Sequence, residues 1–351
     1  MRSQRRYRML ASAVGAACFV ASASLDAQAV ITNGTVTLGV GQRGELNVGS
    51  SAGAPGYGGV GVRLNENGWD GTYAGCTCEG WGAGVSGGTY DGVASTASTT
   101  TGYSNVNDVS FSSTASTATS AVTMRSGATD VMRITQVYTP APETPNLYQV
   151  TVTMQNLTGA ALGVGSDAIR YRRVMDWDVP LPGNEVVTMQ GWGATNLRAM
   201  NSNGFAPSNP FAASSSICGA PTNANFTNIG PCDHGALFDF AFPSLLAGES
   251  RSFTIFYGAF VNLASARVGL GAVGAEVATW AFCAEGRNPG TTFGGACDGA
   301  NGTTFVFGFE GVGGTVIVPD PTVIPEPGTV LLMGTGLLGL LVTARRRRPS
   351  A

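Results

Sequence analysis

Alternation of apolar and polar residues is the main pattern in the middle of the chain, and it predicts β-strands. Over residues 149–155, Val150, Val152 and Met154 alternate with two threonines, which is the two-residue period of a half-buried strand. The same period recurs at Ala236/Phe238/Phe240/Phe242, at Phe253/Ile255/Tyr257 and at Phe305/Phe307/Phe309. Many such strands separated by glycine-rich turns are typical of an all-β protein, and we expect an antiparallel β-sandwich over residues 30–315.

Two segments depart from this alternation. The alanine-rich stretch from Leu263 to Phe282 predicts the one helix of the body, although three glycines within it weaken the helix by up to about 1 kcal/mol each. Residues 94–123 are rich in Ser, Thr and Ala, and they fit either a flexible linker or a hairpin of small residues within the sheet. Because no proline-rich or charged linker divides the body, we expect a single domain.

The N-terminal residues have the order of a secretory signal peptide. Residues 1–8 contain four arginines, an apolar run follows from Met9 to Leu25, and Ala27-Gln28-Ala29 has the A-x-A form of a cleavage site. The sequence therefore predicts a signal peptide over residues 1–29 and an exported mature chain that starts near Val30.

The C-terminal residues predict a short membrane anchor. A proline-rich linker over residues 316–324 leads to Pro325-Glu326-Pro327, and a 17-residue apolar stretch over 328–344 follows. As a helix this stretch spans about 26 Å, the short end of what crosses a bilayer. The four arginines at 345–348 place the tail in the cytoplasm by the positive-inside rule.

The charge distribution of the chain excludes several classes of protein. All 19 cationic residues are arginine, and the segment 30–324 contains 11 of them against 20 acidic residues, a net charge of −9. Proteins that bind nucleic acid carry a basic surface instead, so we expect no nucleic-acid partner. The 51 glycines lack a G-X-Y period, and the 16 Phe, 9 Tyr and 5 Trp exclude an ordinary disordered chain.

The order of Pro-Glu-Pro, short apolar helix and arginine cluster closely resembles the PEP-CTERM sorting signal of Gram-negative bacteria, which is also described as the C-terminal domain of ice-binding proteins. By position, Pro325, Glu326 and Pro327 match the recognition core. The resemblance implies recognition by an exosortase in the inner membrane and passage of the protein to the cell surface or the exopolysaccharide matrix. Whether the anchor is cleaved stays open.

Six cysteines remain after the predicted removal of the signal peptide, as expected for disulfides in an exported chain. Cys218/Cys232 and Cys283/Cys297 share a 14-residue offset, and we expect each pair to close a local loop. Cys76 and Cys78 flank one residue, and redox-active, cross-paired and reduced states are all open for them. A zinc site is not expected, since the chain has one histidine and no C-x-x-C motif.

The segment Ile169 to Val179 (IRYRRVMDWDV) carries the densest charge in the body. As a strand it places Arg170, Arg172, Asp176 and Asp178 on one face. The two aspartates would then stand about 6.6 Å apart, which fits the carboxylate pair of an inverting glycosidase. We favour a solvated Arg/Asp ladder, because the arginines on that face favour ionisation of both aspartates and leave no general acid.

Other candidate sites have simpler explanations. Asn65, Asn67 and Asp70 carry oxygen atoms that suit calcium, as do Asp298 and Asn301. Neither group has the spacing of an EF-hand, and Asn-Gly and Asp-Gly pairs are common turn formers. We interpret both groups as turns and expect no metal and no cofactor.

The functional expectation is a non-catalytic surface or matrix protein that binds exopolysaccharide. Tryptophans can stack on sugars, although most tryptophans of a sandwich lie in its core; the candidates are Trp69, Trp81, Trp177 and Trp192. The segments Cys78–Gly82, Tyr171–Asp178 and Asp233–Phe240 resemble parts of PEP-CTERM proteins without known activity. The alternatives are a glycan hydrolase that uses Asp176 and Asp178 and, on the Ser/Thr-rich segment alone, ice binding.

The first prediction concerns sorting. Replacing Pro325, Glu326 and Pro327 with Ala should leave the protein in the inner membrane, because the motif that the exosortase recognises is lost while the apolar segment stays. Deleting residues 325–351 should instead release a soluble protein. Cell fractionation measures both outcomes, and normal arrival of the Ala variant at the surface would show that this motif does not direct sorting.

Overall fold

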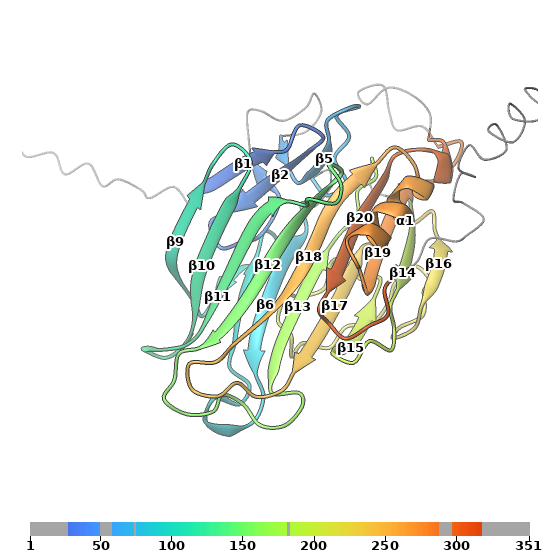
Figure 1. Cartoon of the computed structure of the whole chain (residues 1–351). Coiled ribbons are helices and arrows are strands. Elements are labelled where there is room, and N and C mark those ends of the chain that lie inside the picture. Colours follow the sequence, from blue (N-terminus) through green and yellow to red (C-terminus); the bar gives the residue numbers. More distant parts are fainter. Residues whose placement is uncertain (1–26, 50–57, 74, 181–182, 288–296, 318–351) are drawn as a thin grey trace, which may run out of the picture.

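Two large antiparallel sheets pack face to face in the computed structural model (Figure 1), which describes residues 27–49, 58–73, 75–180, 183–287 and 297–317. The predicted all-β antiparallel fold is confirmed. The predicted membrane segment 328–344 and most of the predicted signal peptide lie outside the described residues. Within the described part of the chain, no helix has the length and apolar character needed to cross a bilayer.

The larger sheet has nine strands in the order β16-β14-β19-β20-β18-β12-β11-β10-β9. In that order their bounds are Phe226–Ile229, Glu185–Gln190, Val277–Cys283, Thr304–Glu310, Ser250–Phe260, Leu147–Asn156, Thr129–Pro140, Ala118–Ser126 and Val106–Ser113. Three of the four predicted alternating segments form β12, β18 and β20, which are adjacent strands at the centre of this sheet. The fourth forms β17 in the other large sheet.

The smaller sheet has six strands in the order β15-β17-β13-β6-β7-β8. In that order their bounds are Leu197–Asn201, Ala236–Phe242, Ile169–Met175, Glu79–Val85, Ala94–Ser98 and Gly102–Ser104. Two further small sheets consist of β1 (Gln28–Thr32), β2 (Val36–Gly41) and β5 (Val62–Leu64), and of β3 (Val48–Gly49) and β4 (Gly59–Val60). Single-turn 3₁₀ helices lie at Gly88–Tyr90 and Gly299–Asn301.

Aromatic side chains from both large sheets fill the space between them. Phe238 of β17 meets Phe307 of β20 edge to face, with ring centroids 5.6 Å apart. Phe240 lies 4.6 Å from Phe309, and Tyr171 of β13 lies 5.0 Å from Phe253 of β18. These contacts use one face of each alternating strand, which is why the two-residue period of phenylalanine in the sequence predicts the core.

The helix prediction is correct in its first half and wrong in its second. Helix α1 spans Leu263–Ala272 and covers the outer face of the larger sheet, where Leu270 joins a cluster with Phe260. Gly274 then adopts φ +70°, a left-handed conformation that ends helices. The chain continues as β19 through Phe282, because its residues pair with β14 and β20 on both sides.

The Ser/Thr-rich segment 94–123 is part of the sheets and not a linker. It forms β7, β8, β9 and the start of β10, and Ala118 to Met124 pair with residues 106–113 of β9. The hairpin interpretation is therefore confirmed. Small residues fit here because β7 packs closely on β6, where an added Cβ at Gly80 would lie 2.7 Å from the carbonyl oxygen of Ala97.

The fold extends slightly beyond the predicted 30–315 at both ends. Gln28 and Ala29, which belong to the predicted signal peptide, pair with Gly41 and Val40 in β2. At the other end, the backbone N–H of Ile317 donates a 2.8 Å hydrogen bond to Ala275.

Three disulfides link the six cysteines of the body. The expected local pairs Cys218–Cys232 and Cys283–Cys297 are both present. Cys76 and Cys78 also form a disulfide with each other. Of the states that the sequence left open, the cross-paired and the reduced ones are therefore not those of the structure.

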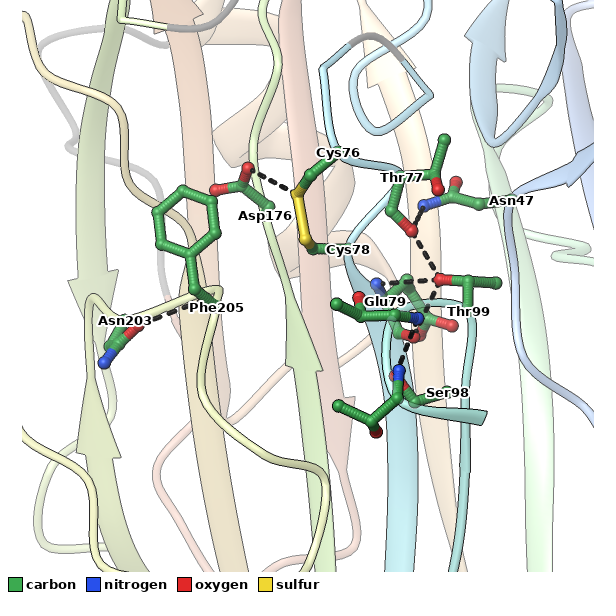
Figure 2. Close-up of a disulfide and its surroundings, with 12 residues drawn as sticks. Asn47, Cys76, Thr77, Cys78, Glu79, Ser98, Thr99, Asp176, Asn203 and Phe205 are labelled. Carbon is green, nitrogen blue, oxygen red and sulfur yellow. Dashed lines mark hydrogen bonds between the residues drawn. A yellow bond between two sulfur atoms is a disulfide. The ribbon is translucent and has the colours of Figure 1, made fainter. Parts of the chain in front are cut away.

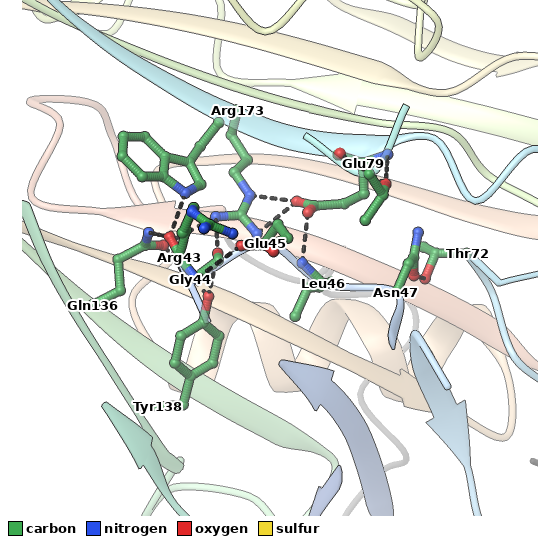
Figure 3. Close-up of polar contacts among 12 residues, drawn as sticks. Arg43, Gly44, Glu45, Leu46, Asn47, Thr72, Glu79, Gln136, Tyr138 and Arg173 are labelled. Carbon is green, nitrogen blue, oxygen red and sulfur yellow. Dashed lines mark hydrogen bonds and ion pairs between the residues drawn. The ribbon is translucent and has the colours of Figure 1, made fainter. Parts of the chain in front are cut away.

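A buried ion pair lies between the sheets (Figure 3). Arg173 of β13 is fully buried, and its Nε donates to Glu79 Oε1 on β6 at 2.5 Å. Its Nη1 donates to the carbonyl oxygen of Gly44 at 3.1 Å and to Gln136 Oε1 of β11 at 3.0 Å. The second carboxylate oxygen of Glu79 accepts from Leu46 N. One guanidinium therefore connects the smaller sheet, the larger sheet and the segment 43–46.

The second prediction tests this pair. Glu79→Gln should lower the free energy of unfolding by about 3–5 kcal/mol, because it leaves the Arg173 guanidinium buried without its counter-charge. The double variant Arg173→Met, Glu79→Leu should cost less than the sum of the single losses, since no charge then stays buried. Denaturant unfolding of the purified protein measures each value.

The exposed pair Arg125–Asp130 provides the matched control. Arg125→Met should cost about 1 kcal/mol or less, because water screens this pair. Equal losses at the two pairs would contradict a special role for the buried one.

Candidate functional site

The predicted ligand face of Ile169 to Val179 does not exist as one surface. Strand β13 ends at Met175, so Asp176 and Asp178 follow the strand and do not continue its alternation. The N–H of Asp176 donates to Cys78 O and that of Asp178 donates to Gly71 O, each at 2.8 Å. The aspartates therefore bond to the segments around Cys78 and Gly71 and lie outside the strand that carries the arginines.

Arg172 pairs with an aspartate of the neighbouring strand. It stands directly opposite Asp239 of β17 and forms a bidentate pair with it at 2.6 and 2.7 Å. Its remaining N–H groups donate to the carbonyl oxygens of Pro207 and Ala212. The cross-strand Arg/Asp pairing is present, but both side chains are buried, so the expectation of a solvated ladder was wrong.

Arg170 lines a polar groove of about 520 Å³ together with Arg198 and Arg172. Arg170 and Arg198 both contact Asp167, at 3.7 and 3.3 Å. Three arginines thus share two aspartates, Asp167 and Asp239, which balance most but not all of the positive charge of the groove.

Asp176 and Asp178 lie in a buried acidic environment. Burial, followed by the nearby Asp233 carboxylate, raises the pKa of Asp176 to about 8. Burial also raises the pKa of Asp178 to about 9, with Asp176 and Glu185 adding to the effect. Burial likewise raises the pKa of Glu185 on β14 to about 9. The expectation that Arg170 and Arg172 keep both aspartates ionised was therefore wrong.

His234, the one histidine of the chain, is fully buried, and its ring lies beside the backbone of Ile229 and Glu185. Burial lowers its pKa to about 4.

Asp70 is also buried, and its carboxylate accepts from the N–H groups of Gly61, Val62 and Thr72. Asp70 is thus a turn-forming residue, as the sequence pattern predicts.

A groove of about 700 Å³ lies beside the end of β14. Trp192 borders it with 39% of its surface exposed, whereas Trp69, Trp81 and Trp177 are buried in the core. The polar side chains of the groove are amides, hydroxyls, one cationic group and one acidic group; they belong to Gln190, Asn225, Thr227, Asn228, Thr315, Arg267 and Glu276.

The backbone holds Trp192 at the edge of this groove. Its N–H donates to Asn225 Oδ1 at 2.8 Å. Gly191 before it has φ +106°, and an added Cβ there would lie 2.6 Å from Val277 Cα. Only glycine fits this conformation and this close approach, so the Trp192 loop is held against the start of β19.

Two donors in the groove have no partner among the described residues. The Nε1–H of Trp280 is buried with its ring only 5% exposed, and the Nε–H of Arg267 is buried too. Buried donors are nearly always paired with protein, water or ligand. Trp280 and Arg267 both line the groove, so these two unpaired donors lie beside it.

Trp192 was one of four stacking candidates in the sequence, and no local pattern separates it from the other three. Gly-Trp-Gly occurs both at 80–82 and at 191–193, and only the second is in a loop. Trp280 was not singled out, and neither was the proximity of Asp233 to the two aspartates after β13.

The third prediction rests on the three raised carboxyl pKa values. In a buffer that contains a chelator, the free energy of unfolding should fall as the pH rises from about 4 to about 9. The unfolded chain loses these protons near pH 4 and the folded chain keeps them up to pH 8–9. The folded state binds more protons in this window, and the stability is lost as the pH passes through the folded pKa values.

Denaturant unfolding at a series of pH values measures this slope, and Asp178→Asn should make it shallower. A stability that stays level or rises up to pH 9 would contradict the raised pKa values.

Comparison with known proteins finds similarity at the C-terminus. Curated proteins give no match to the chain. Residues 323–348 match the family described as the PEP-CTERM protein-sorting motif, and they include Pro325, Glu326 and Pro327. The chain therefore carries a PEP-CTERM protein-sorting motif, the signal of an exported protein that an exosortase recognises.

Proposed function

We propose that this protein is a non-catalytic component of the cell surface that binds exopolysaccharide through the Trp192 groove. The sorting motif supplies the destination, since it directs proteins to exosortase processing during export. The groove supplies the binding surface. The main support for this proposal is an exposed indole, that of Trp192, in a groove that is also lined by Trp280 and Arg267. The donors Trp280 Nε1–H and Arg267 Nε–H are buried and have no protein acceptor among the described residues.

This combination suits a sugar chain. The apolar C–H face of a pyranose ring stacks on an exposed indole, and its hydroxyl groups accept and donate hydrogen bonds to amides and to buried N–H groups. The groove is open, and it is bordered by Trp192 from the loop after β14 and by Asn225 from the segment before β16. An open groove of this size accepts an internal segment of a polymer as readily as its end.

The alternative is a hydrolase that uses Asp176 and Asp178. A general acid and an ionised partner require two carboxyls whose pKa values differ widely. Here burial raises both pKa values in the metal-free protein, to about 8 and 9, so the two carboxyls do not divide into an acid and an ionised base. This environment supports a binding function over hydrolysis.

The fourth prediction tests the groove. Exopolysaccharide isolated from the exporting cells should bind the wild-type protein in affinity electrophoresis. Trp192→Ala should weaken this binding about tenfold or more, because an exposed aromatic anchor is lost. Trp192→Phe should keep most of it, and Trp280→Phe should weaken it several-fold by removing one donor.

Phe205→Ala is the matched control, because Phe205 is similarly exposed (43%) and is not part of the groove. Wild-type binding by the Trp192→Ala variant would exclude the groove. Release of reducing ends by the wild-type protein, lost in Asp176→Asn, would replace the proposal with the hydrolase.

A further inference from the structure

Three carboxylates from two segments of the chain meet beside the end of β13. One oxygen each from Asp176, Asp178 and Asp233 lies within 4.8 Å of the other two. Asp176 and Asp178 are 1% and 0% exposed, whereas Asp233 is exposed. The cluster therefore opens to solvent on the Asp233 side.

The buried carboxylates of this cluster have few donors among the described residues, and the backbone N–H of Trp177 is the one that favours the charged form of Asp176. Neither oxygen of Asp178 has a hydrogen-bond partner, and Asp176 Oδ1 has none. The other oxygen of Asp176 lies 3.5 Å from Cys76 Sγ (Figure 2). That sulfur is joined to Cys78, so it has no proton to donate. Buried carboxyl oxygens without donors are rare, because their desolvation is not compensated.

The neighbouring charges do not compensate the cluster either. Arg172 and Arg173, which precede the aspartates on β13, are paired with Asp239 and Glu79. Glu185 is a fourth acid close enough to raise the pKa of Asp178. Its own oxygens accept from Val179 N and Gly183 N, so its nearest donors are used within its own segment.

Two disulfides hold the cluster in place without any added ligand. The N–H of Asp176 is bonded to the carbonyl oxygen of Cys78, whose sulfur is joined to that of Cys76 (Figure 2). Asp233 follows Cys232, which is linked to Cys218. The carboxylates are thus positioned in advance, which lowers the entropic cost of binding an ion between them.

From this arrangement we infer that Asp176, Asp178 and Asp233 bind a hard divalent cation, and that the cation is calcium. Calcium takes oxygen ligands at about 2.3–2.6 Å, so two ligands on opposite sides of the ion lie about 4.6–5.2 Å apart. It tolerates irregular geometry and completes its shell with water, which reaches the exposed Asp233 side. The ligand set holds no thiolate and no imidazole, the donors that select zinc or copper.

The fifth prediction tests this site on the purified protein after removal of metals with EGTA. Isothermal titration with calcium chloride should show one ion bound per chain. Saturating calcium should raise the unfolding temperature by about 5 °C, because the ion binds the folded state only. Magnesium should bind more weakly, since it requires a tighter octahedron.

Asp233→Asn is the decisive variant, because its side chain is exposed and the change is isosteric. Without calcium its unfolding temperature should equal or exceed that of the wild type, since a like charge beside Asp176 is removed, and its calcium affinity should fall at least tenfold. Asp130→Asn removes the same charge from an exposed position far along the chain and should bind calcium like the wild type.

Two results would overturn the inference. The first is a wild-type protein with no calcium heat and no calcium-dependent rise in unfolding temperature. The second is an Asp233→Asn variant that binds calcium as tightly as the wild type. Equal or tighter binding of magnesium would overturn the assignment to calcium.

Discussion

The ion pair between Arg173 and Glu79 is the constraint on which the arrangement of the smaller sheet depends. A guanidinium between two packed sheets is stable only where its partners meet it, and here they come from β6, from β11 and from the segment 43–46. The preceding residue, Arg172, points to the outer face and pairs with Asp239. A shift of β13 by one residue would exchange the two arginines and break both pairs, so the two arginines together fix its register.

That register determines the surroundings of the two aspartates after the strand. Arg172 and Arg173 are both paired with acids of neighbouring strands. They therefore do not neutralise the aspartates that follow the end of β13 at Met175. Asp176 and Asp178 then enter a buried site where their neighbours are other acids. The sequence pattern predicts one face that carries both arginines and aspartates. In the structure the arginines of β13 are paired within the sheet, and the aspartates form a separate acidic cluster.

Local patterns in the sequence were sufficient to predict the strands, but they were insufficient to predict the groove and the acidic cluster. The alternating phenylalanines of β17 and β20 predict the core because each strand needs only its own period to be recognised. The burial of Arg173 depends on Glu79, which lies 94 residues away, and no local period encodes that pairing. Gly-Trp-Gly at 80–82 lies in the core and at 191–193 borders a groove; the difference arises from the sheet around β6, not from the triplet.

The groove and the acidic cluster lie at the two ends of the same pair of strands. Strand β14 starts at Glu185, beside the cluster, and ends at Gln190, in the groove. Its neighbour β16 carries the groove residues Thr227 and Asn228, and the chain reaches Asp233 shortly after it. Since β16 is the edge strand and pairs with β14 alone, few ladder bonds hold it. A cation that joins Asp233 to the end of β13 would therefore hold this edge strand to the smaller sheet, and with it the amides that face the groove.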